Sequence, residues 1–127
     1  MDDFILITHK SENGIEFKCV SLFNKLGILC SYVGIYTGSN FDLNKLRDNI
    51  YNIDVHGGIT WNEEVELDNT LPWMMSKENS HYIWIGWDYG HNDEINLHTG
   101  SGRKYSKKYL LKEFQSAVKQ IADIIKI

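Results

Sequence analysis

The chain has 127 residues, which is the usual length of one domain. Its hydrophobic content of 43% and charged content of 24% are typical of a globular protein. Thirteen basic against seventeen acidic residues leave a net charge of −4, which argues against a protein that coats nucleic acid. The acidic N-terminus and the lack of an apolar stretch of roughly 20 residues predict a soluble, cytoplasmic protein with neither signal peptide nor membrane span.

The two cysteines, Cys19 and Cys30, are too few for a disulfide scaffold. We expect both to be reduced, buried and apolar in their behaviour. They do not form a Cys-x-x-Cys pair, so a thiolate zinc site is not expected. The favoured interpretation below requires no metal or other cofactor, and a chelator should then leave the melting temperature unchanged.

The N-terminal part of the chain predicts a β-hairpin. Apolar runs at residues 4–7 and 15–19 flank Asn13-Gly14, a pair typical of tight hairpin turns. Residues 20–26 are ambiguous, because their apolar spacing is partly helical and Gly27 stands where a helix C-cap glycine would.

Further strands are expected at residues 28–36, 53–60 and 81–88. Between the first two, Asn40 is the expected cap of a short helix over residues 41–50. We expect strands 53–60 and 81–88 to pair, because glycine and polar residues occupy matching positions at their ends.

A long amphipathic helix is predicted from its cap, Ser106, to about Lys126. The order of elements predicts an α+β domain over residues 1–127, with a mainly antiparallel sheet and the C-terminal helix packed on one face. The apolar surface of this helix is broad, and it extends to Leu111, Ala122, Ile124 and Ile127. We therefore expect a homodimer or higher homo-oligomer through this helix.

Two short segments carry the candidate site. In a strand, Asp54, His56 and Thr60 would share one face of the first segment. The second segment contains Asp88 and His91 at the end of the next strand. If the strands are neighbours, these residues could form one site.

Three interpretations of this set remain open. In the structural one, the acids and histidines satisfy turns and backbone groups. In the metal interpretation, zinc, manganese or iron binds to Asp54, His56, Asp88 and His91, with Asp93 in reserve. In the binding interpretation, the polar groups contact an organic ligand, and aromatic rings stack on it. The candidate rings are those of Trp61, Trp84 and Trp87.

A basic cluster and an apolar segment complete the candidates. Arg103 and Lys104 follow a glycine-rich stretch before the long helix, where a phosphate could bind, although a solvated loop would explain them equally well. Trp73 follows Pro72 in an apolar segment that could close over a ligand, pack on another subunit or tuck against the core.

Val55-His56-Gly57-Gly58-Ile59-Thr60, followed by Ile85-Gly86-Trp87-Asp88-x-x-His91, resembles a family of small phage- and prophage-encoded proteins of uncharacterised activity. The resemblance extends to the stretch 25–34 and spans roughly residues 18–93, with Tyr89 standing where the family has cysteine. Small phage accessory proteins often counter host defence, and one class sequesters nucleotide-derived signals. By that analogy, the resemblance implies an anti-defence role in an infected or lysogenic bacterium.

The favoured hypothesis is a non-enzymatic protein that sequesters an ADP-ribose-like or cyclic nucleotide signal. Polar contacts would come from Asp54, His56, Thr60, Asp88 and His91, and phosphate contacts from Arg103 and Lys104. The first alternative is a metal-dependent phosphodiester hydrolase, with the metal on His56, Asp88 and His91 and with Asp54 as base or orienting group. The second is a protein–protein interaction module centred on Trp73.

Overall fold

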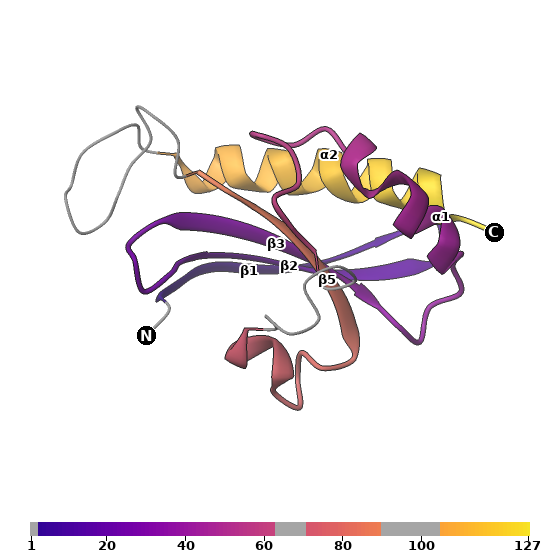
Figure 1. Cartoon of the computed structure of the whole chain (residues 1–127), viewed down its shortest axis with the longest axis horizontal. Helices are drawn as coiled ribbons and strands as arrows, with labels where there is room; N and C mark the ends of the chain where they lie inside the picture. The colour runs from indigo at the N-terminus through magenta and orange to yellow at the C-terminus, as the bar shows by residue number, and fades with distance from the viewer. Residues whose placement is uncertain (1–2, 63–70, 90–104) are drawn as a thin grey trace.

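A five-stranded antiparallel sheet in the order β1-β2-β3-β5-β4 is the centre of the computed structural model, which describes residues 3–62, 71–89 and 105–127. Two α-helices cover one face of this sheet, so the predicted α+β class is confirmed (Figure 1). The strands are β1 Asp3–Glu12, β2 Ile15–Phe23, β3 Leu29–Tyr36, β4 Trp61–Asn62 and β5 Tyr82–Asp88. The helices are α1 Leu43–Asn49 and α2 Lys107–Ile125, with 3₁₀ turns η1 Ile50–Asn52 and η3 Pro72–Met75.

The predicted hairpin is present between β1 and β2. Asn13 and Gly14 have φ values of 54° and 74°, the two left-handed residues that a tight hairpin turn of this kind requires. The ambiguous stretch that follows is strand rather than helix as far as Phe23. The turn after it is organised by Asn24, whose side-chain oxygen accepts hydrogen bonds from the backbone N–H groups of Leu26 and Ile28 at 2.9 and 3.1 Å.

Helix α1 begins later than the sequence predicts. Its N-cap is Asp42, whose carboxylate accepts from the backbone N–H groups of Asn44 and Lys45 at 3.0 and 3.2 Å. The expectation that Asn40 caps this helix is therefore wrong. Asparagine and aspartate are both good N-cap residues. Asp42 is in addition joined to the core, because its backbone N–H donates to the Ile125 carbonyl at 2.8 Å.

Helix α2 agrees with its prediction. The Ser106 hydroxyl caps it by accepting from the Tyr109 N–H at 3.1 Å. Its apolar side is largely covered: Ala122 is fully buried and Ile124 packs against the core, which leaves Leu111 and Ile127 exposed. The broad uncovered helix surface expected from the sequence is thus not found, since α1 and the sheet together cover more of α2 than one sheet would.

Residues 53–60 do not form the predicted strand. They form a loop that turns at His56 and Gly57, where Gly57 and Gly58 adopt left-handed φ values of 69° and 78°. The expected pairing with β5 is reduced to a hydrogen bond from the Thr60 N–H to the Gly86 carbonyl, at 3.0 Å, and to the short strand β4 that follows. Two glycines in the left-handed region favour a turn over an extended strand.

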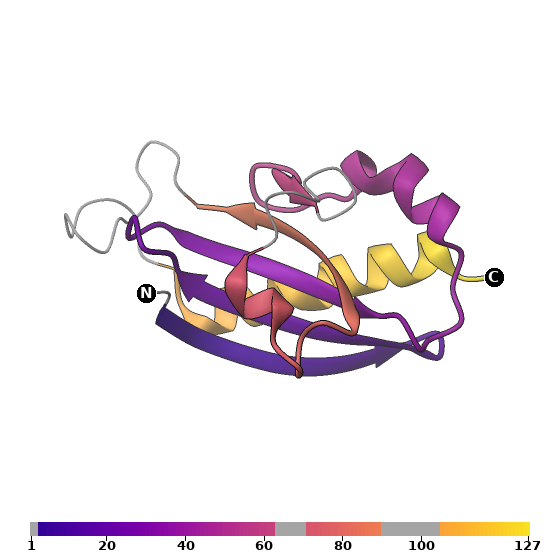
Figure 2. The same ribbon diagram turned by 60° about the horizontal axis from the view of Figure 1, so that its bottom comes forward.

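The sheet separates two apolar clusters. The larger one lies between the sheet and the helices, and it includes Trp87. The smaller one lies on the opposite face, here called the open face, and it includes Trp84 under Met74 of η3. Figure 2 shows η3 in front of β3 on this side. The two tryptophans point to opposite faces because they are three residues apart in β5, as the strand period predicts.

Candidate functional site

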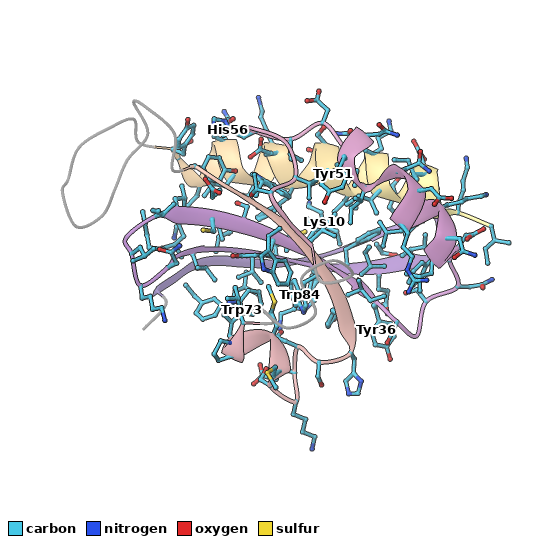
Figure 3. The ribbon with its side chains drawn as sticks, in the orientation of Figure 1. Lys10, Tyr36, Tyr51, His56, Trp73 and Trp84 are labelled. Carbon is cyan, nitrogen blue, oxygen red and sulfur yellow. The ribbon has the colours of Figure 1, made fainter. Side chains whose placement is uncertain are left out.

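The sheet divides the predicted site residues into two groups. Asp54 and His56 lie beside α2, where they line a cavity of about 430 Å³ with Tyr109 and Lys112. Thr60, Trp61 and Asp88 instead line a cavity of about 510 Å³ that faces the opposite side. Figure 3 shows His56 next to α2, and Trp73 and Trp84 on the other side of the sheet. Asp54 and His56 therefore share no cavity with Asp88, whereas Thr60, from the same predicted segment as Asp54 and His56, does.

The loop that carries Asp54 and His56 is attached to α2 through its backbone. The Gln120 amide accepts from the Asp54 N–H at 2.8 Å and donates to the Asp54 carbonyl at 2.9 Å. The His56 N–H donates to the Glu113 carboxylate at 2.9 Å. These bonds use the main chain of the loop, so they satisfy its peptide groups where a strand ladder would otherwise have done so.

The His56 ring is part of an aromatic cluster at the N-terminal end of α2. Its centroid lies 4.7 Å from that of Tyr89 and 5.4 Å from that of Tyr105, and Tyr105 is 4.9 Å from Tyr109. The His56 Nδ1 lies 3.4 Å from the Tyr109 hydroxyl. These rings are in contact with one another, so the cluster is a packed unit in the described structure.

Glu113, which is partly buried, is the centre of a polar network between α2 and the sheet. One carboxylate oxygen accepts from the Trp87 indole N–H at 3.0 Å and from the Tyr89 hydroxyl. The Tyr89 oxygen also receives the Trp87 N–H at 2.9 Å and lies 3.3 Å from the Ser31 hydroxyl. Because the Tyr89 proton points at Glu113, Ser31 is the donor to Tyr89, and Ser21, at 2.8 Å from Ser31, continues the chain. Burial and the adjacent carboxylate raise the pKa of Tyr89.

The cavity around Asp88 is called the polar cavity. Its lining residues are Asn24, Ile28, Cys30, Tyr32, Thr60, Trp61, Trp87 and Asp88. The Thr60 hydroxyl donates to the Asp88 carboxylate at 3.3 Å, and the Trp61 ring meets Tyr32 edge to face at 5.8 Å. A carboxylate and three aromatic side chains thus border the same space.

A second cavity, the apolar cavity, has a volume of about 450 Å³. It is lined by Phe4, Leu22, Asn24, Lys25, Leu26, Tyr32, Leu71, Pro72 and Trp73. Trp73 makes edge-to-face contacts with Phe4 at 5.6 Å and with Tyr32 at 5.3 Å. Asn24 and Tyr32 belong to both linings, so the two cavities adjoin. Together they are called the cleft.

The remaining predicted site residues are either buried or outside the described residues. Trp84 and Trp87 are fully buried. The Trp84 indole N–H donates to the Asn79 carbonyl, and the Trp87 indole N–H donates to Glu113 and Tyr89. His91, Asp93, Arg103 and Lys104 lie outside the described residues. Within the described ranges no three His, Cys, Asp or Glu side chains are grouped as metal ligands would be.

Sequence reasoning missed three residues that the structure makes prominent. Tyr32 joins the two cavities, Asn24 shapes the turn beside them, and Glu113 accepts three hydrogen bonds from two segments. Asn24 shortly before Gly27 was an available turn signal. Glu113 had none, because an acid on a helix next to apolar residues is ordinarily solvated.

Comparisons with family models, curated proteins and solved structures give no match to this chain. The phage-family resemblance therefore stays a sequence-based expectation. Neither described helix combines the length and the hydropathy that a membrane crossing requires. What the fold and the site define is an α+β domain with a two-part aromatic and polar cleft on the face of its sheet opposite the helices.

Proposed function

We propose that this protein binds a small nucleoside-like molecule in the cleft and sequesters it. The observation that carries the proposal is the junction at Tyr32, where an apolar aromatic cavity meets a cavity bordered by the Asp88 carboxylate. Ligand pockets typically combine apolar walls with a few polar groups that orient the ligand, and their volumes are of this size.

The two halves of the cleft suit different parts of such a ligand. Trp73 and Phe4 offer apolar surface to a flat ring in the apolar cavity. Asp88 accepts hydrogen bonds, so it suits sugar hydroxyls or an exocyclic amine in the polar cavity. Lys25 lines the apolar cavity and would place positive charge near a phosphate.

Asp54 and His56 take no part in this proposal, because they line a cavity with residues of α2. The phosphate contacts of Arg103 and Lys104 remain sequence-based predictions. Sequestration of a nucleotide-derived signal, as an anti-defence role, is the biological setting that the phage resemblance suggests. It adds nothing to the support that the cleft itself provides.

The first experiment asks whether the cleft binds nucleosides. Purified protein is titrated with adenosine monophosphate, ADP-ribose and a cyclic dinucleotide by isothermal calorimetry and tryptophan fluorescence. We expect at least one to bind in the micromolar range and to change the fluorescence. Trp73→Phe and Trp61→Phe should together remove most of that change, since Trp73 and Trp61 are the partly exposed tryptophans that border the cleft while Trp84 and Trp87 are buried.

A matched pair of variants locates the site. Asp88→Asn should weaken binding about tenfold or more, since hydrogen bonds to a charged acceptor contribute roughly 1.5–3 kcal/mol. Asp54→Asn removes the same charge from the α2 side and should leave affinity unchanged. Equal effects of the two substitutions, or no binding of any of the three compounds up to millimolar concentration, would contradict the proposal.

A further inference from the structure

Strand β1 is an edge of the sheet. It pairs with β2 on one side, and no strand among residues 3–62, 71–89 and 105–127 pairs with its other side. Its register with β2 is regular from Leu6 to Glu12, with one irregularity between Phe4 and Leu6. An unpaired, regular run of this length presents a row of backbone donors and acceptors that another strand can use.

The same strand exposes large apolar side chains on the open face. Phe4 is 44% exposed and Ile7 is 53% exposed. Their partners in β2 are Leu22 and Val20, which belong to the open-face cluster. Figure 2 shows β1 along the outer edge of the sheet. Edge strands commonly carry charges that prevent pairing, yet this strand has Ile7 near its middle.

We infer that β1 pairs antiparallel with β1 of a second copy of this chain, through a two-fold axis that passes near Ile7 perpendicular to the sheet. This inference does not rest on the proposed function, although Phe4 borders both the apolar cavity and this edge. Such an axis keeps the open faces of both copies on the same side and places Ile7 opposite its own copy. The two sheets then form one continuous sheet.

The irregularity in β1 makes this register self-complementary. With Ile5 skipped, as it is in the pairing with β2, Phe4 is set opposite His9 and Asp3 opposite Lys10. The pair of Phe4 and His9 brings two aromatic rings together across the seam. A second copy is therefore a better fit than an unrelated strand, whose side chains would have to supply this pattern by chance.

The oligomeric state tests the inference. Light scattering after size exclusion at about 100 µM should report a mass twice the 14.8 kDa of the chain. Ile7→Lys should give a monomer with an unchanged circular dichroism spectrum, because the Ile7 side chain is exposed in the single chain and a lysine there does not disturb its fold. Leu111→Lys is the matched control on α2 and should remain dimeric.

Disulfide crosslinking gives a second, independent measurement. Ile7→Cys should form a disulfide-linked dimer on mild oxidation, since residues facing each other across an antiparallel pair have Cα separations that suit a disulfide. Leu111→Cys should not, and the native cysteines are buried. A monomeric wild-type protein, a dimer that persists in Ile7→Lys, or crosslinking through position 111 instead would overturn the inference.

Discussion

The Tyr89 hydroxyl donates a hydrogen bond to the Glu113 carboxylate and so joins the end of β5 to the middle of α2. Trp87 donates to the same oxygen, and the loop at His56 donates to the other one. One side chain of α2 thus fixes two segments that lead toward the cleft on the far side of the sheet. The network extends inward through Ser31 and Ser21, which are fully buried.

Loss of the Glu113 carboxylate should destabilise the protein. Glu113→Ala leaves the buried Tyr89 hydroxyl without its acceptor and removes one of the two acceptors of the Trp87 indole N–H. We expect the free energy of unfolding to fall by about 2 kcal/mol, as measured by urea denaturation. Gln115→Ala, at an exposed position of the same helix, should change it by less than about 0.5 kcal/mol. Equal effects of the two substitutions would refute a structural role for the network.

The raised pKa of Tyr89 predicts a loss of stability in alkali. Tyrosine in the unfolded chain has a pKa of about 10, whereas burial and Glu113 keep Tyr89 protonated to higher pH in the folded protein. The contribution of Tyr89 to the free energy of unfolding is fully present below pH 10. It decreases as the pH rises from there through the folded-state pKa, by about 1.4 kcal/mol per pH unit at most. Urea unfolding between pH 8 and 11 should show a smaller decrease for Tyr89→Phe than for the wild type. Parallel curves for the two proteins would contradict the prediction.

Cys19 should be chemically inert in the native protein. Burial raises the pKa of its thiol to about 12, so at pH 8 only roughly one in ten thousand molecules carries the reactive thiolate. Mass spectrometry after iodoacetamide treatment should find Cys19 unmodified in native protein and modified in urea. Rapid native labelling of Cys19, at the rate seen for the unfolded chain, would show that the thiol is not enclosed by β1, β2 and the helices.

Substitution of Gly86 should destabilise the protein, because the Tyr32 ring occupies the space that a side chain at this position would need. A β-carbon at this position would collide with the Tyr32 ring and would lie 2.9 Å from the Ser31 carbonyl oxygen. Gly86→Ala should lower the free energy of unfolding by about 1–3 kcal/mol. In a Tyr32→Ala background the added cost should be smaller, which a double-mutant cycle measures. If Gly86→Ala costs the same in both backgrounds, the clash is with the backbone of β3 at Ser31 and not with the Tyr32 ring.

Elements with strong local signals were correctly predicted from the sequence. The hairpin at Asn13-Gly14 and the helix capped by Ser106 are both present, because turn chemistry and helical periodicity act over a few neighbouring residues. The faces of Trp84 and Trp87 also followed from the strand period alone. Residues 53–60 failed as a strand for a local reason as well, since two successive glycines permitted the left-handed turn.

The sequence by itself therefore determined the α+β class, the hairpin, the long helix and the alternation along β5, because each depends on short-range geometry. Only the tertiary structure decided that Asp54 and Asp88 face different cavities, that Glu113 accepts hydrogen bonds from His56, Trp87 and Tyr89, and that Asn24 and Tyr32 join two cavities. These relations depend on which strands become neighbours and on which side of the sheet each loop passes. Contacts between residues far apart in the chain decide both, and no local pattern encodes them.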